Sequence, residues 1–264
     1  MTAQAQYTEE IRFISLEYFL TNKILFKDAY KRNSEILKER FVKKIIIQDE
    51  NNKTIADASV DKNGRVISSR EYSPIVRVSP VHTNAGYDLK NNLVQLTRND
   101  IMNDDTLIIN FGYVGNTLLN YRSITAGEVT EYCDIRYDDK SDMSKLTGFD
   151  SPLWQGDSVP YSVNFKYDSQ NRLIDVRVVQ DKDAVYEISY SGDTVKIVSG
   201  DGEGYESYVM RDNVIISHII FSEQLNFTAI RNFTYDENGL ISRISIEDGR
   251  GNKYFQKYEY NYSH

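Results

Sequence analysis

The chain has 264 residues, with 31 Lys and Arg against 39 Asp and Glu, for a formal net charge of −8. This acidic balance argues against nucleic acid as a partner, because phosphate binding needs clustered Lys and Arg. No apolar run approaches the roughly 18 residues of a membrane-spanning helix, so the sequence predicts no transmembrane segment. The 20 tyrosines and only 4 prolines favour many half-exposed β-strands.

The N-terminal segment, residues 1–41, is predicted to be helical. It is rich in Leu, Ile, Glu and Lys, lacks Gly and Pro, and spaces its apolar residues at broadly helical intervals. A break into two helices is expected between Lys31 and Ser34, because Asn33 or Ser34 can accept a hydrogen bond from the first amides of a second helix. Such a segment is expected to cover the apolar face of a following sheet.

The first residues also bear on localisation. Ala3-Gln4-Ala5 is a small-x-small pattern like the end of a secretory signal, although the charged and apolar regions of a signal do not precede it. The pattern favours an extracytoplasmic protein that is periplasmic, on the outer surface or secreted. An ordinary polar N-terminus is the alternative.

From residue 42 to 264 the sequence repeats one unit, which reads as strand, tight turn and strand. Clear copies occupy 59–72, 110–124, 164–179 and 232–246, and in the last three an Asn precedes Phe-x-Tyr. Each copy continues through a polar run that ends in Asn. Asn and Gly tolerate positive φ, so each run is a hairpin turn signal.

Tyrosines mark the repeat at intervals of roughly 23 to 30 residues, apart from one longer gap between Tyr190 and Tyr235, and this period is typical of stacked supersecondary units. The anchor tyrosines are Tyr113, Tyr137, Tyr167, Tyr190, Tyr235 and Tyr258.

Two irregular stretches, 72–88 and 148–162, interrupt the repeat and hold all four prolines. Proline lacks a backbone amide donor, and this loss destabilises a β-sheet least in irregular segments. The second stretch is either a boundary between two β halves or a long loop within one sheet. We favour the loop, because the repeats on both sides share the same motif.

Exposed aromatic residues are the best candidates for ligand contact. Trp154 lies in a loop flanked by Pro and Gly, with Tyr161 nearby, and such rings can stack on sugars or pack against a protein partner. The alternative is that Trp154 fills one end of the sheet core. Function is expected in the segments that interrupt the repeat.

Residues for catalysis or metal binding are sparse. His82, His218 and His264 are widely spaced, and Cys133 is the lone cysteine and is expected to be a small packed residue. No nucleotide-binding or nucleophile motif occurs, so no cofactor, metal site or catalytic residue is predicted. The acidic stretches 138–142 and 200–205 are expected to be solvated turns.

The F-x-Y-D units at 165–173 and 233–240 resemble the tyrosine-aspartate (YD) repeats of Rhs-type proteins. Together with 137–150 they are similar to uncharacterised β-repeat lipoproteins and secreted proteins of the Bacteroidota. The resemblance covers roughly 42–264, although Val114 replaces the motif Asp in one unit and no lipoprotein cysteine lies near the start. It implies an extracytoplasmic antiparallel sheet of consecutive hairpins, with no catalytic set.

These observations predict a mainly β protein, built as a long antiparallel meander that curls or partly closes into a barrel, with the helical segment 1–41 packed on a β domain of 42–264. The predicted function is a non-enzymatic binding or structural module that recognises a glycan or a cell-surface protein. The alternatives are a glycoside or ester hydrolase with an acidic pair in the sheet concavity, and a carrier of a small apolar ligand.

Overall fold

The computed structural model describes residues 16–72, 81–100, 105–150, 159–180, 184–200, 202–224 and 226–263. Helices α1 (Leu16–Leu25) and α2 (Lys27–Glu39) precede an 18-stranded sheet. The strands are β1 (Val42–Gln48), β2 (Thr54–Val60), β3 (Val66–Glu71), β4 (Val81–Tyr87), β5 (Leu93–Asp100), β6 (Asp105–Val114), β7 (Thr117–Thr125), β8 (Glu128–Tyr137), β9 (Met143–Asp150), β10 (Val159–Tyr167), β11 (Leu173–Val179), β12 (Ala184–Ser191), β13 (Thr194–Ser199), β14 (Gly204–Arg211), β15 (Val214–Ser222), β16 (Phe227–Tyr235), β17 (Ile241–Asp248) and β18 (Lys253–Tyr262).

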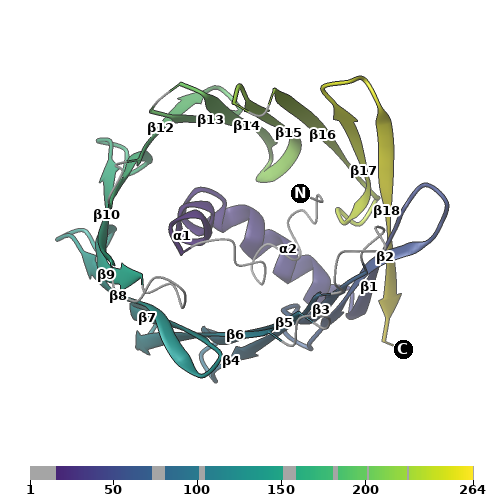
Figure 1. Cartoon of the computed structure of the whole chain (residues 1–264). Coiled ribbons are helices and arrows are strands. Elements are labelled where there is room, and N and C mark those ends of the chain that lie inside the picture. Colours follow the sequence, from purple (N-terminus) through teal and green to yellow (C-terminus); the bar gives the residue numbers. More distant parts are fainter. Residues whose placement is uncertain are drawn as a thin grey trace.

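The sheet closes into a barrel (Figure 1). Each strand pairs antiparallel with the next along the chain, and β1 pairs with both β2 and β18. At the closing seam Ile45 lies opposite Tyr260, and Ile47 lies opposite Tyr258. The predicted meander of hairpins is confirmed, and its ends meet. Closure satisfies the backbone groups that the two edge strands of an open sheet would expose.

Alternation along each strand separates an apolar inner face from a wet outer face. On β1 and β2 the buried residues Ile45 and Ile47 lie opposite Ala58 and Ala56. On the other face, Lys44 Nζ lies 3.5 Å from a carboxylate oxygen of Asp57, the residue between Ala56 and Ala58. The hydrophobic core is therefore inside the barrel.

Both helices lie inside the ring of strands (Figure 1). Phe26, Ala29 and Leu37 are each 2% exposed and belong to the same buried cluster as the inward residues of the strands. This arrangement confirms that the helical segment packs on the concave face of the sheet.

The expected break between Lys31 and Ser34 is wrong, because α2 runs through these residues and the break lies at Phe26. Phe26 supplies no side-chain cap, and its ring packs 4.6 Å from that of Tyr208. The hydroxyl of Ser34 donates to the carbonyl oxygen of Gly64 instead of capping a helix. Tertiary packing, rather than local capping, sets the helix boundary.

The stretches predicted to be irregular are partly β-strand. β4 occupies residues 81–87, inside the first stretch, and pairs with β3 and β5. In the second stretch, β9 and β10 pair directly, with Pro160 opposite Phe149. The division into a helical segment 1–41 and a β domain 42–264 stays a prediction.

Inward-facing tyrosines tie neighbouring hairpins together at one end of the barrel, which we call the ladder end. Each hydroxyl donates to a carbonyl oxygen at the start of the preceding strand, so the bond joins two adjacent strands at the end opposite the connection between them. These bonds are Tyr87 to Val66 (3.1 Å), Tyr137 to Leu118 (2.8 Å), Tyr167 to Met143 (3.0 Å), Tyr190 to Leu173 (2.9 Å), Tyr235 to Ile215 (2.8 Å) and Tyr260 to Ile241 (2.7 Å). The repeated tyrosine therefore has an architectural role.

The aspartate after the tyrosine builds the turn. Its Oδ1 accepts the backbone N–H groups of the residues two and four positions later, over 2.8 to 3.0 Å, and the residue three positions later has positive φ. At the ladder end this geometry recurs at Asp88, Asp138, Asp168 and Asp236, each directly after a tyrosine, and at Asp61, which follows Val60. Asp49 and Asp248 form the same turn at the other end.

Candidate functional site

A cavity of about 490 Å³ opens at the ladder end between the helices and three hairpin turns. We call it the mouth pocket. One wall is formed by α1 and α2, and the other by the turns β2–β3, β4–β5 and β6–β7. These turns are neighbours in the barrel, because consecutive hairpins pair side by side.

The helical wall carries a stripe of lysines. Lys27, Lys31 and Lys38 recur at spacings that place them on one face of α2, and Glu35 lies on the same face. The opposite face holds buried apolar residues such as Leu37. The amphipathic pattern thus directs the apolar face to the barrel wall and the lysines to the pocket.

The turn wall carries carboxamides and aromatic rings. Asn63, Asn91, Asn92 and Asn116 come from the three turns, and Tyr113 is among the rings that line the pocket with them. Asn91 is the residue with positive φ (67°) in its turn, where Asn meets little steric penalty. The residues that make the hairpins thus also supply amide donors and acceptors to the pocket.

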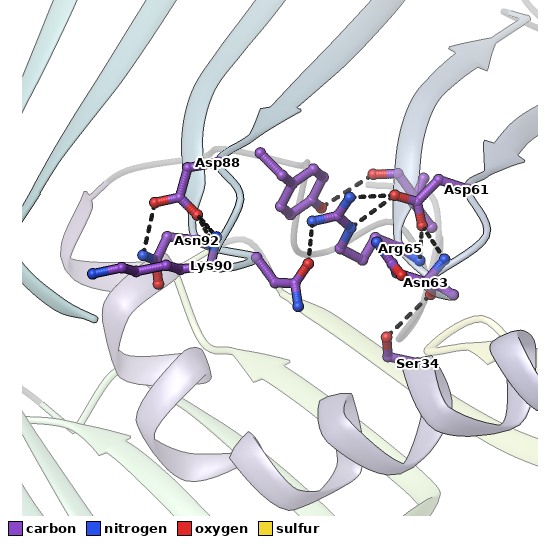
Figure 2. A network of polar contacts seen from close by, with 11 residues as sticks. Ser34, Asp61, Asn63, Arg65, Asp88, Lys90 and Asn92 are labelled. Atoms are coloured by element: carbon purple, nitrogen blue, oxygen red, sulfur yellow. Dashed lines mark hydrogen bonds and ion pairs between the residues drawn. The ribbon is translucent and has the colours of Figure 1, made fainter. Parts of the chain in front are cut away.

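Side-chain hydrogen bonds join the first two turns, and another docks the first turn on α2 (Figure 2). Arg65 Nε donates to Asp61 Oδ2 over 2.8 Å, and Arg65 Nη1 donates to Asn91 Oδ1 over 2.8 Å. The guanidinium also lies 4.3 Å from the centre of the Tyr87 ring. Ser34 connects α2 to the first turn through the carbonyl oxygen of Gly64, 3.2 Å away.

Asn92 extends this connection to the third turn. Its Nδ2 donates to Gly115 O over 3.0 Å and to Asp88 Oδ2 over 2.9 Å, and Figure 2 shows Asn92 beside Asp88. The turn wall is therefore held in one arrangement before any ligand arrives, which lowers the entropic cost of binding.

The charges on the two walls differ in how they are compensated. Burial raises the pKa of Asp61, but hydrogen bonds from Arg65 and from backbone amides outweigh it and hold that pKa below 3.8. The charge of Arg65 is thus matched by an ionised Asp61. On the helical wall Lys31 Nζ lies 3.9 Å from Glu35, and both side chains are exposed, so this pair is weak. The lysines leave the pocket positive.

The two predicted binding residues lie elsewhere or are undescribed. Trp154 falls outside the described residues. Tyr161 lies on β10 facing the lumen, is 8% exposed, and donates to Glu131 Oε1 over 2.7 Å. Tyr121 donates to the other oxygen of Glu131, also over 2.7 Å. Tyr161 does not line the mouth pocket, and a binding role for it stays a prediction.

A second polar cluster lies in the lumen on β14, β15 and β16. His218 Nε2 is 3.0 Å from Glu206 Oε2, and the hydroxyl of Tyr208 donates to the same oxygen. His218 stacks on Tyr208 at 4.1 Å, and Arg231 Nη1 lies 3.4 Å from His218 Nδ1. Burial raises the pKa of Glu206, but these partners outweigh it and lower that pKa. The cluster is a hydrogen-bonded network inside the core.

Metal sites and reactive thiols are not evident in the described part of the chain. No group of three or more His, Cys, Asp or Glu residues there could hold a metal ion. Cys133 is buried and unbridged, as expected of a packed residue. Nor does a described helix have the length and apolarity needed to traverse a bilayer.

The mouth pocket was not predicted from the sequence. The lysine spacing in α2 is visible in the sequence, but helical periodicity alone does not reveal what that face meets. The asparagines were recognised only as turn formers. The basic run Lys38–Lys44, which ends in β1, contributes only Lys38 to the pocket.

Comparisons with known proteins assign no family to this chain. A scan against protein-family models and a search of curated proteins found no match. A porin-like protein from Bacteroides uniformis is similar over 84% of this chain and 97% of its own, with 12% identity and a TM-score of 0.42. A porin-like protein from Bacteroides vulgatus is similar over 84% of this chain and 99% of its own, with 12% identity and a TM-score of 0.42.

A chain in the Photorhabdus luminescens Tc holotoxin pore is matched over 78% of this chain but only 16% of its own, with 12% identity and a TM-score of 0.31. Similarities at this level carry no inference about function. The resemblance to YD-repeat proteins therefore rests on the quoted residues.

Proposed function

We propose that the protein is a non-enzymatic binding or structural module that acts outside the cytoplasm and takes a glycan in the mouth pocket. One observation carries this proposal. A wall of carboxamides and aromatic rings faces a polar helix across a cavity of about 490 Å³. This volume falls within the roughly 300–1,000 Å³ of small-molecule sites.

The chemistry of the turn wall suits carbohydrate. Sugar rings offer hydroxyl groups that both donate and accept, and the amides of Asn63 and Asn116 can do the same. Ring carbons of a sugar can pack on aromatic side chains such as Tyr113. The hydrogen bonds that join the turns keep these groups in place, so the binding free energy is not spent on ordering them.

Glycan-array binding followed by calorimetry tests the proposal. Wild-type protein is expected to bind at least one glycan class, and Asn63→Ala with Asn116→Ala to weaken that binding. Asn84→Ala, on an exposed position of β4 away from the pocket, is the matched control and is expected to leave affinity unchanged. Binding to no glycan, or equal affinity in all variants, would contradict the proposal.

One observation favours a hydrolase as the second candidate. Glu131 on β8 is the register partner of Asp150 on β9, so two acidic residues are neighbours across the sheet. Glycoside hydrolysis uses a pair of carboxylates. However, both carboxylate oxygens of Glu131 already accept tyrosine hydroxyls. Turnover in a glycoside and ester screen that is lost in Glu131→Gln would favour this second candidate over binding alone.

A further inference from the structure

We infer that the ligand of the mouth pocket is an acidic oligosaccharide, one that carries carboxylate or sulfate groups, bound along the lysine stripe of α2. The inference rests on the proposed function, because it assigns a ligand class to the same pocket. The evidence for it is the charge and spacing of the lysines and the amide groups that face them.

The lysine stripe is a concentration of positive charge in an acidic protein. The chain has a net charge of −8, yet the pocket is lined by Lys23, Lys27, Lys31 and Lys38, with Glu35 as the single carboxylate among the described lining residues. Arg65 also lines the pocket, and Asp61 matches its charge. Low-dielectric walls focus such a field into the cavity and raise the local concentration of anions. The pocket therefore selects against cationic ligands and attracts anionic ones.

The stripe is unfavourable for the helix by itself. Lys27 and Lys31 are four residues apart on an exposed face, and like charges at this spacing repel. Within the described part of the chain Lys27 and Lys38 make no ion pair, and the Lys31–Glu35 pair is solvent-exposed at 3.9 Å. A bound anion would relieve this repulsion, so ligand charge and helix stability are coupled.

The length of the stripe favours a ligand of several units. Lys27 and Lys38 are eleven residues apart, which corresponds to about 16 Å along the axis of an α-helix. A single small anion would reach one of these ammonium groups only. A chain of sugars with repeated acidic groups can meet the lysines in turn, while its hydroxyls face Asn63 and Asn116 on the opposite wall.

The amide wall distinguishes this ligand from other polyanions. A nucleic acid or an acidic peptide would meet the same lysines, but neither presents the dense hydroxyl groups that suit a wall of carboxamides and aromatic rings. We therefore commit to the acidic oligosaccharide and treat the other polyanions as outcomes of the test.

Calorimetry on the full chain with three tetrasaccharides of equal length provides that test: galactose, galacturonic acid and sulfated galactose. The two acidic ligands are expected to bind at least about tenfold more tightly than the neutral one, with an affinity that falls as salt is raised. The difference between the carboxylated and sulfated ligands identifies which acid group the pocket prefers.

Two triple variants of equal net charge locate the effect. Lys27→Gln, Lys31→Gln and Lys38→Gln together are expected to lower the affinity for the acidic ligands about tenfold and to leave neutral binding unchanged. Lys43→Gln, Lys140→Gln and Lys166→Gln together change exposed lysines outside the pocket and are expected to bind like wild type. Circular dichroism of both triples confirms that the fold is retained.

The failures of the two proposals are distinguishable. If neutral and acidic tetrasaccharides bind equally, and the triple variant of α2 changes neither affinity, the inference of an acidic ligand is wrong but the proposal of a glycan site stands. Binding of an acidic peptide or an oligonucleotide through the α2 lysines, with no acidic sugar bound, would overturn the oligosaccharide. If no sugar on a broad array binds, the proposed function itself fails.

Discussion

The hydroxyl of Ser34 in α2 lies 3.2 Å from the carbonyl oxygen of Gly64 in the β2–β3 turn, and this bond fixes the helical wall of the mouth pocket against its turn wall. Gly64 has φ +78°, and a Cβ atom at this position would lie 2.0 Å from the carbonyl oxygen of Ser34 and 2.8 Å from the amide nitrogen of Lys38. The close approach of α2 to the turn therefore requires glycine.

Gly64→Ala is expected to destabilise the protein by about 3 kcal/mol or more, because the new methyl group adds a clash with α2 to the strain of positive φ. Gly251→Ala is the matched control, since Gly251 has φ +80° with nothing within 4 Å of a Cβ atom. It should cost about 1–2 kcal/mol. Urea denaturation measures both, and equal losses would show that α2 does not lie against this turn.

The tyrosine ladder predicts a second loss of stability. Tyr167→Phe removes the hydroxyl that donates to the carbonyl oxygen of Met143 and is expected to lower the free energy of unfolding by about 1 kcal/mol. Tyr254→Phe, at a ring that is 43% exposed, should change it by much less. If chemical denaturation gives the same value for both variants, the ladder bonds do not contribute to stability.

The aspartate turns predict a fall in stability at low pH. Hydrogen bonds lower the pKa of Asp168, chiefly from the backbone N–H of Arg172, and the pKa of Asp61 is also held below 3.8. A carboxylate with a depressed folded-state pKa stabilises the fold above its unfolded-state value. That contribution is lost as the pH falls through the folded-state pKa. Stability should therefore decline as the pH drops below 3.8.

Asp168→Asn supplies the control for this pH dependence. An Asn side chain keeps the Oδ1 acceptor for the turn amides but does not titrate. The variant is expected to be less stable than wild type at neutral pH, because its ion pair with Arg172 is gone, and the difference should shrink in acid. If the difference in stability between wild type and Asp168→Asn stays constant with pH, the titration of Asp168 does not contribute to stability.

Glu131 should be intolerant of neutralisation. Its two oxygens accept the hydroxyls of Tyr121 and Tyr161, so Glu131→Gln would turn an amide N–H₂ group toward one phenol donor. A loss of about 1.5–3 kcal/mol is expected, in the range for hydrogen bonds to charged groups. Exposed Glu128→Gln is the control on the same strand, and an equal change in thermal unfolding would argue against this cluster.

Local chemistry explains which parts of the fold could be predicted. The hairpins at 110–124, 164–179 and 232–246 follow from Asn and Gly at positive-φ positions and are confirmed as β6–β7, β10–β11 and β16–β17. The repeat also marked four of the tyrosines that form the ladder bonds, namely Tyr137, Tyr167, Tyr190 and Tyr235.

Features that depend on distant partners were harder to predict. The anchor at Tyr258 was displaced by two residues, because Tyr260 makes the ladder bond, and Tyr87 was missed inside a stretch expected to be irregular. Closure depends on the pairing of β1 with β18, which lie more than 200 residues apart, so local periodicity could suggest a curled sheet and leave a barrel as one option.

The mouth pocket arises in the same way from long-range placement. The sequence spacing of Lys27, Lys31 and Lys38 places them on one face of a helix. They lie opposite Asn63 because Ser34 of the same helix hydrogen-bonds to Gly64. No local pattern carries that contact, so the aromatic candidates Trp154 and Tyr161 were preferred.

The most direct test of the account is hydrogen exchange by mass spectrometry, with and without the galacturonic acid tetrasaccharide. The account predicts slower exchange in α2 and in the turns at 61–65, 88–92 and 114–117, with the rest of the barrel unchanged. Protection confined to the outer face of the strands, or no change at saturating ligand, would contradict the assignment of the mouth pocket as the binding site.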